Sequence, residues 1–245
     1  MTTPERTVLS VTGPEAASFL QGLVSNDVTR LKDGLVYAAM LTPQGKYRAD
    51  FFLVPDGDGV LIDVATPLAA DLLRALTMYK LRSKVEVAQT DRVVSRGTGP
   101  ALDGAFADPR DPRMGWRAYD GRPDEAGVDW DALRVAACVP ESGIELTPDT
   151  FLLEAGFERL NGVDFRKGCY VGQEVTARMK HKTELRKGLA VVTVTGSAPV
   201  GTEITAEGKA AGVLFTQSGG SGIAYLRFDR AKGEMTAGDA RLTHP

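Results

Sequence analysis

Apolar and polar positions alternate in short runs over the first quarter of the chain, and turn-forming residues separate these runs, as is typical of antiparallel β-strands. Strands are expected at residues 8–11, 36–41, 47–54 and 60–64. Apolar residues recur at helical spacing in other stretches. Helices are expected after Gly13-Pro14, from Pro67 onward and at residues 129–137. The order of elements indicates an α+β fold rather than a strict alternation of strands and helices.

The pattern changes after Leu185 to short β-rich runs that are separated by glycine-rich turns. These runs lie at residues 188–195, 202–206, 211–217 and 222–228. Runs of this length and spacing are typical of a small β-barrel or sandwich. We therefore expect two regions, an α+β region at 1–184 and a C-terminal β-barrel at 185–245.

The composition of the chain bears on the protein's cellular location and on the kinds of molecule that it binds. The chain has 245 residues, 43% of them apolar, and its formal net charge of −3 gives no overall attraction to nucleic acid or anionic membranes. Its apolar runs are far shorter than the ~20 residues that cross a bilayer, and its start lacks the pattern of a secretory signal. We expect a cytoplasmic protein with neither a membrane nor a nucleic acid as partner.

Few residues are available for metal binding or for familiar catalytic motifs. The cysteines are Cys138 and Cys169 and the histidines are His181 and His244, too few for a self-contained zinc or iron–sulfur site. No metal ligand is therefore expected. The spacings of a P-loop, a dinucleotide-binding loop and a nucleophile elbow are absent, which argues against kinase and classical hydrolase chemistry.

The segment Lys167-Gly168-Cys169-Tyr170-Val171-Gly172-Gln173-Glu174 carries the most distinctive chemistry. Arg166 and Lys167 precede Cys169 and would favour a thiolate if they point toward the sulfur. The two glycines permit tight or positive-φ backbone, and Gln173 and Glu174 offer groups that orient a ligand. The alternative is that Cys169 is a small buried apolar residue, as most isolated cysteines are.

This run resembles the K-G-C-[YF]-x-G-Q-[ED] signature of the YgfZ family, which is related to the glycine cleavage T-protein. The chain is also similar to that family at Phe19-Leu20-Gln21-Gly22, at Asn26-Asp27-Val28 and at Thr42-Pro43-Gln44-Gly45. The resemblance implies two α+β subdomains with antiparallel sheets and a small C-terminal β-barrel around a tetrahydrofolate site. It also implies assembly or repair of iron–sulfur clusters, with Cys169 as the functional thiol and Lys167 beside it as a catalytic residue.

Comparison with the T-protein, an aminomethyltransferase, separates folate binding from carbon transfer. Its G-x-x-x-D-D carboxylate pair resembles Gly45 to Asp50, but the first carboxylate is replaced by Ala49. Leu152 stands where its substrate-binding arginine would be, in a stretch that continues to Glu154. An alanine can neither accept a proton nor anchor a folate nitrogen. We therefore expect tetrahydrofolate binding without transfer.

The resemblance makes several residues candidates for contact with tetrahydrofolate. They are Tyr37, Asp50, Glu154, Gln173, Glu174 and Arg178. Asp50 and Glu154 would hydrogen-bond the pterin, or would be a solvated strand carboxylate and a helix-terminus charge, respectively. A basic run from Arg178 to Lys187 would be a solvated linker face, a seat for the glutamyl carboxylates of folate, or a contact for a partner's acidic or nucleic-acid surface.

Three functions stay open at this point. The first is a folate-dependent factor that supports iron–sulfur clusters, with client enzymes or cluster-assembly proteins as partners. The second is an enzyme, a tetrahydrofolate-dependent aminomethyl or one-carbon transferase. The third is a thiol redox or scaffold protein that binds no folate.

Overall fold

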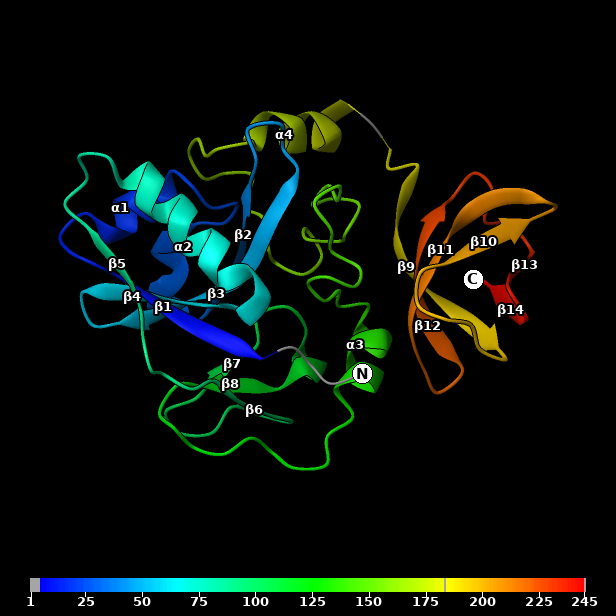
Figure 1. Ribbon diagram of the computed structural model, residues 1–245, viewed down its shortest axis with the longest axis horizontal. Helices are drawn as coiled ribbons and strands as arrows, with labels where there is room; N and C mark the ends of the chain where they lie inside the picture. The colour runs from blue at the N-terminus through cyan, green and yellow to red at the C-terminus, as the bar shows by residue number, and fades with distance from the viewer. Residues whose placement is uncertain (1–4, 183, 245) are drawn as a thin grey trace.

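The N-terminal part of the chain is an antiparallel sheet in the strand order β2-β3-β4-β1-β5 (Figure 1). The computed structural model describes residues 5–182 and 184–244. The strands are β1 (Arg6–Thr12), β2 (Val36–Leu41), β3 (Tyr47–Asp56), β4 (Gly59–Ala65) and β5 (Glu86–Gln89). The first four contain the ranges predicted from the alternation of apolar and polar positions, and the predicted antiparallel pairing of β2, β3 and β4 is confirmed.

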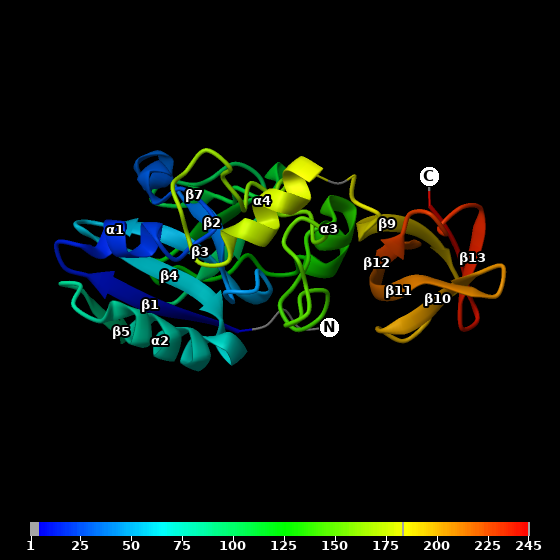
Figure 2. The same cartoon turned by 90° about the horizontal axis from the view of Figure 1, so that it is seen from above.

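Both faces of this sheet are buried. One face packs against helices α1 (Ala16–Gln21) and α2 (Thr66–Lys80), and Figure 2 shows α2 running beside β1 and β5. The strand side chains on that face include Leu9, Val11, Phe51, Leu53 and Ile62. The opposite face packs against the middle of the chain with Val8, Tyr37, Phe52, Val54 and Leu61. Two buried faces explain why these strands contain so few polar residues.

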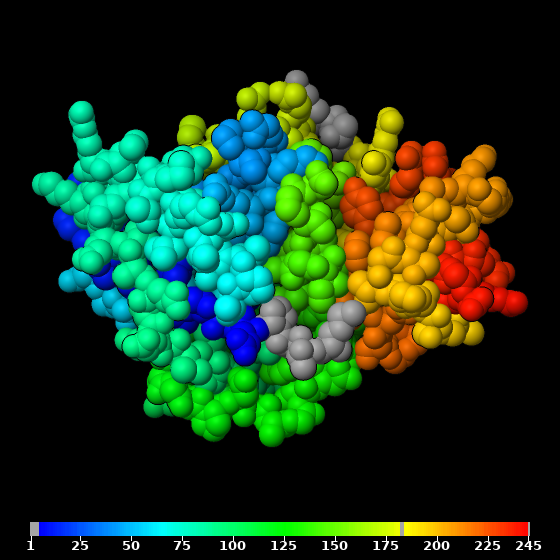
Figure 3. Space-filling view, viewed as in Figure 1, coloured from blue at the N-terminus to red at the C-terminus, as the bar shows by residue number. Residues whose placement is uncertain are grey.

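The middle of the chain fills the space between the sheet and the C-terminal part, where it forms the green column of Figure 3. It contains a small sheet in the order β6-β8-β7 and a helix that lies within the predicted range 129–137. These elements are β6 (Ser95–Gly97), β7 (Phe106–Ala107), β8 (Trp116–Ala118) and α3 (Trp130–Ala137). Two 3-10 helices, η1 (Val28–Asp33) and η2 (Pro112–Met114), complete the connections.

The C-terminal part is a closed barrel in the strand order β10-β11-β12-β9-β14-β13. Its strands are β9 (Lys187–Thr195), β10 (Thr202–Ala206), β11 (Lys209–Ser218), β12 (Ser221–Arg227), β13 (Glu234–Ala237) and β14 (Ala240–Thr243). The α+β class with a C-terminal barrel is thereby confirmed. The hairpin of β13 and β14 was not predicted, because each strand has only four residues. The proposed division of the chain between 184 and 185 stays a prediction.

The basic run after the cysteine segment differs from its expected form. Its first half lies on helix α4 (Gln173–Lys182), not on a linker, and its last residue begins β9. The buried side of the helix is small, with Thr176 2% exposed and Val175 and Met179 half-buried. A buried face with so few large apolar side chains gives almost no helical pattern in the sequence. The side chain of Lys182 lies outside the described residues.

A buried carboxylate joins the sheet to the middle of the chain. Asp63 on β4 accepts hydrogen bonds from Arg6 Nε at 2.6 Å, from Arg117 Nη1 at 3.0 Å and from the Tyr119 hydroxyl at 2.9 Å. Burial acts to raise the pKa of Asp63, but the charges of Arg6 and Arg117 hold it below its ordinary value. A buried charge group of this kind stabilises a fold only while every member has its partner.

Replacing this carboxylate by an amide tests how much the connection contributes to stability. We expect Asp63→Asn to lower the free energy of unfolding by about 3–5 kcal/mol, because Arg6 and Arg117 lose their buried counter-charge. Urea denaturation measures the change. Asp71→Asn is the matched control, since the Asp71 side chain is 68% exposed and its loss is expected to change stability by less than about 1 kcal/mol. Equal urea midpoints for the two variants would contradict the prediction.

Candidate functional site around Cys169

The predicted signature forms a surface loop that leads into α4. Cys169 is exposed in this loop, whereas Cys138 is buried at the C-terminal end of α3. Gln173 is the first residue of α4, and its Oε1 atom accepts a hydrogen bond from the backbone N–H of Tyr170 at 3.0 Å. Gln173 thus closes the loop on itself. The interpretation of Cys169 as a buried apolar residue is wrong.

The two glycines of the segment have different roles. Gly172 has φ +82°, and a Cβ atom there would lie 2.4 Å from the carbonyl oxygen of Thr42 in the β2–β3 turn. Only glycine fits this close approach. A Cβ atom on Gly168, by contrast, would have no heavy atom within 4 Å. Gly172 therefore seats the loop on the sheet, while Gly168 leaves open space beside Cys169.

Lys167 has a packing role that the sequence did not predict. Its ammonium group donates hydrogen bonds to backbone carbonyls within residues 21–26. Partial burial lowers the pKa of this amine to about 8, while the carboxylates of Asp27 and Asp164 act in the opposite direction. Lys167 therefore anchors the loop to the end of α1, and its assignment as a catalytic residue stays a prediction.

The other signature side chains lie on the outer surface of α4. Glu174 is exposed and forms an ion pair with Arg178 at 2.6 Å, one helical turn along. Such a pair is solvated and contributes little to stability. Glu174 and Arg178 therefore lie near Cys169 in the fold, but they neutralise each other in this structure.

Asp50 is the centre of a closed hydroxyl network inside the protein. Its carboxylate accepts hydrogen bonds from Tyr37 at 3.0 Å, from Tyr47 at 2.7 Å and from Ser142 at 2.6 Å. The residue is only 4% exposed, so the expectation of a solvated strand carboxylate is wrong. Burial and the charge of Asp50 raise the pKa of both tyrosines, which keeps them as hydroxyl donors.

A β-bulge brings Tyr47 into this network. Met40 pairs with Ala49, but the next pair joins Leu41 to Tyr47, so one extra residue is inserted into β3. The insertion turns Tyr47 onto the same face of the sheet as Asp50. Strict alternation would have placed it on the opposite face. Sequence reasoning missed Tyr47 for this reason, and it missed Ser142 because that residue is 92 positions away from Asp50.

Glu154 lies where the middle of the chain meets the barrel. Its carboxylate accepts a hydrogen bond from the Tyr225 hydroxyl on β12 at 2.7 Å. The segment around it forms turns, so Glu154 does not end a helix as one interpretation expected. The two residues border a cavity of about 200 Å³. Its other lining residues are Glu145, Thr147, Asp149, Thr150 and Phe215.

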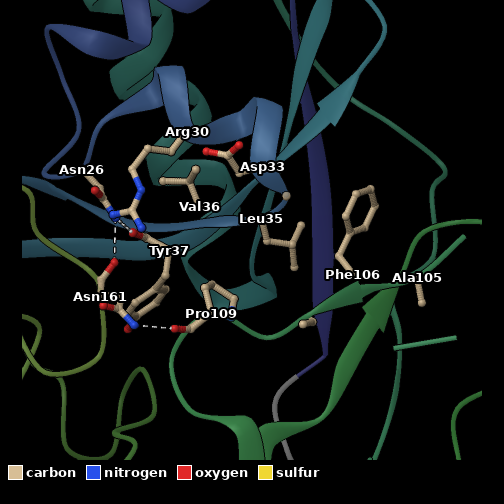
Figure 4. Close-up of a pocket in the computed structure, with 12 residues that line it drawn as sticks. Asn26, Arg30, Asp33, Leu35, Val36, Tyr37, Ala105, Phe106, Pro109 and Asn161 are labelled. Carbon is tan, nitrogen blue, oxygen red and sulfur yellow. Dashed lines mark hydrogen bonds between the residues drawn. The ribbon is translucent and has the colours of Figure 1, made fainter. Parts of the chain in front are cut away.

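A larger cavity of about 400 Å³ lies beside the start of β2. Arg30 on η1 and Phe106 on β7 stand on opposite sides of it (Figure 4). Its other lining residues are Asn26, Asp33, Gly34, Leu35, Val36, Tyr37, Ala105, Ala107, Pro109 and Asn161. Ligand cavities typically measure ~300–1,000 Å³, so this one is large enough for a small ligand. Nothing in the sequence pattern had singled out Arg30.

The residues predicted to bind tetrahydrofolate do not surround one cavity. Tyr37 borders the larger cavity and Glu154 the smaller one, while Asp50 is enclosed by hydroxyl groups. Gln173, Glu174 and Arg178 lie on α4, directly after the loop of residues 167–172 that carries Cys169, which we call the cysteine loop. As a set, these side chains do not fit a folate, because the acceptor expected to hold the pterin is already occupied. Of the two cavities that these residues border, the one that Tyr37 and Arg30 share is in the size range of a ligand site and has a cation.

Across residues 5–182 and 184–244, no group of three or more His, Cys, Asp or Glu side chains is arranged to hold a metal ion. Over the same ranges, every helix is too short or too polar to cross a membrane.

The contrast between the two cysteines leads to a direct measurement. We expect iodoacetamide to alkylate Cys169 in the native protein at least about 100-fold faster than Cys138, because Cys138 is buried and burial raises the pKa of its thiol. Peptide mass spectrometry after timed quenching measures both rates. The two rates should converge in urea, and equal rates without denaturant would contradict the assigned burial.

Comparisons with known proteins place the chain in a family. Residues 186–245 match the family model described as the CAF17 C-terminal beta-barrel domain. The chain shares its fold with a glycine cleavage system aminomethyltransferase T from Bartonella henselae, with a TM-score of 0.77 and 17% identity over 98% of this chain and 83% of that one.

Two curated relatives extend the match over most of the chain. The mitochondrial iron–sulfur cluster assembly factor IBA57 from mouse is 30% identical over 280 residues, and the human IBA57 is 30% identical over 276 residues. Each match spans 94% of this chain and 78% of the relative. Both relatives are named as mitochondrial, which contradicts the expected cytoplasmic location. This extent of identity shows that the chain belongs to the family of iron–sulfur cluster assembly factors named IBA57.

Proposed function

We propose that this protein supports iron–sulfur cluster assembly by presenting the Cys169 thiolate to iron. The observation that carries the proposal is an exposed thiol on a loop that is fixed at both ends, in a chain whose relatives are named for cluster assembly. Thiolates are the usual protein ligands of iron–sulfur clusters. On binding, the thiol releases its proton to solvent and the sulfur donates an electron pair to iron.

The number of available ligands points to a partner. Protein-bound clusters generally need four protein ligands, and Cys169 is the one exposed cysteine of the chain's two. The remaining ligands would come from a second protein, either a cluster carrier or a client enzyme. The open space beside Gly168 supports the approach of such a partner to the sulfur. Cys169 would therefore be one ligand of a cluster shared between two proteins.

Complementation tests the thiol. In cells that lack this protein, we expect wild type to restore the activity of iron–sulfur enzymes and Cys169→Ser to restore less than about a tenth of it, because a hydroxyl is a poor iron ligand. Cys138→Ala is the matched control, since it removes the other, buried thiol. Protein levels are compared by immunoblot. Full rescue by Cys169→Ser would reject the proposal.

The two alternative functions receive less support from the side chains. Ala49 and Leu152, which stand at the T-protein's reactive positions, are each 1% exposed and packed in apolar clusters. An apolar side chain there supplies no acid, base or carboxylate contact for carbon transfer. A thiol redox cycle within one chain would need a second accessible cysteine, and Cys138 is buried.

Tetrahydrofolate binding is a second proposal, and the cavity of about 400 Å³ beside Tyr37 supports it. Arg30 at the edge of this cavity would pair with a glutamyl carboxylate of the folate, because guanidinium and carboxylate groups form strong charge-assisted hydrogen bonds. Phe106 and Leu35 would contact the apolar part of the ligand. This is binding alone, with no reaction step assigned to the folate.

Calorimetric titration with tetrahydrofolate tests this second proposal. We expect wild type to bind at sub-millimolar concentration and Arg30→Ala to bind about tenfold or more weakly, because a charged hydrogen bond is lost. Lys32→Ala is the control, since Lys32 is an exposed cation on the same 3-10 helix and does not line the cavity. Absence of binding by wild type would reject the proposal without affecting the role of Cys169.

A further inference from the structure

The ammonium group of Lys167 sits among backbone carbonyls of the last residue of α1 and of the segment that follows it. It donates to the carbonyl oxygen of Gln21 at 2.8 Å, to that of Val24, and to that of Asn26 at 3.0 Å. The last carbonyls of a helix lack partners within the helix, and a cation is favourable there. Lys167 comes from a segment 141 to 146 residues further along the chain. The contact therefore joins two distant segments.

Further hydrogen bonds hold the same two segments side by side. The backbone N–H of Asp164 donates to the carbonyl of Ser25 at 3.1 Å, and that of Val171 donates to the carbonyl of Gly22 at 3.2 Å. The Ser25 hydroxyl donates to the carbonyl of Gly162 at 2.6 Å. The cysteine loop is thus fixed before and after Cys169, and Lys167 provides the side-chain anchor nearest to the thiol.

Lys167 has no N–H group left to donate a hydrogen bond to Cys169. An ammonium group has three N–H donors, and three carbonyls accept them here. The amine also lies 4.9 Å from the centre of the Tyr170 ring, on the residue that follows Cys169. Lys167 therefore contacts residues 21–26 and the Tyr170 ring without hydrogen-bonding the sulfur.

We propose that Lys167 is a positioning residue for Cys169, which clamps the loop to residues 21–26 and holds the thiol outward. This inference rests on the proposed role of Cys169. It assigns the lysine of the signature to holding the loop, in place of activating the thiol by its charge. Arg166 is the other cation before Cys169. Within residues 5–182 and 184–244 its exposed side chain forms no hydrogen bond, so it provides the comparison.

The test combines hydrogen exchange with complementation on the full-length protein. In Lys167→Met, we expect the amides of Tyr170 and Val171 to exchange about tenfold or more faster, because charged hydrogen bonds to the carbonyls are lost. Lys167→Arg keeps a cation with several donors, and we expect it to stay within about threefold of wild type. Arg166→Met removes the same charge from the same loop and should exchange like wild type.

Rescue of iron–sulfur enzyme activity in the deficient cells should follow the same order, with Lys167→Met defective and both Lys167→Arg and Arg166→Met active. Thermal melting checks that each variant is folded, and the arginine variant keeps the test decisive if the methionine variant is not. Equal exchange in Lys167→Met and Arg166→Met, or full rescue by Lys167→Met, would overturn the positioning role. Full rescue by Cys169→Ser would instead overturn the proposed function.

Discussion

The burial of Asp63 is the constraint on which the arrangement of the N-terminal two-thirds of the molecule depends. A fully buried carboxylate needs counter-charges or hydrogen-bond donors, and Arg117 comes from the middle of the chain to provide both to Asp63. Arg117 also contacts Asp108 at 3.3 Å, and Asp108 binds Arg110 at 2.8 Å. The guanidinium groups of Arg110 and Arg117 lie over the Phe52 ring of β3. One charge group thus fixes the face on which the middle of the chain docks.

The position of the cysteine loop depends on this docking of the middle of the chain. Once the middle of the chain lies on the sheet, the segment after it runs back along residues 21–26 and meets the turn between β2 and β3. Gly172 allows the loop to touch Thr42, and Lys167 closes the contact with the end of α1. The thiol is therefore held by the rigid sheet, although it sits on a surface loop. A metal ligand that must meet a partner benefits from such support, because little order has to be gained on binding.

The sequence predicted those features of the structure that depend on neighbouring residues in the chain. The alternation of apolar and polar residues and the turn residues are local features. They were therefore enough to predict the first four strands and the short strands of the C-terminal barrel. Cys169 was found through a signature of eight adjacent residues. Helix α4 was not, because its buried face offers Thr176 and few large apolar residues. The partners of Lys167 and the bulge that turns Tyr47 depend on distant pairing and on register, which local patterns do not encode.

A fold shared with an aminomethyltransferase does not by itself supply that enzyme's reactive groups. The interior position that would hold a reactive carboxylate is Ala49, and the neighbouring Asp50 accepts hydrogen bonds from three hydroxyl groups. A carboxylate that is 4% exposed and accepts three internal hydrogen bonds stabilises the core and has little access to a ligand. The exposed thiol lies instead on the outside, at Cys169, where a second macromolecule can reach it. The fold therefore acts as a scaffold, and the location of the unsatisfied, exposed group decides what it can do.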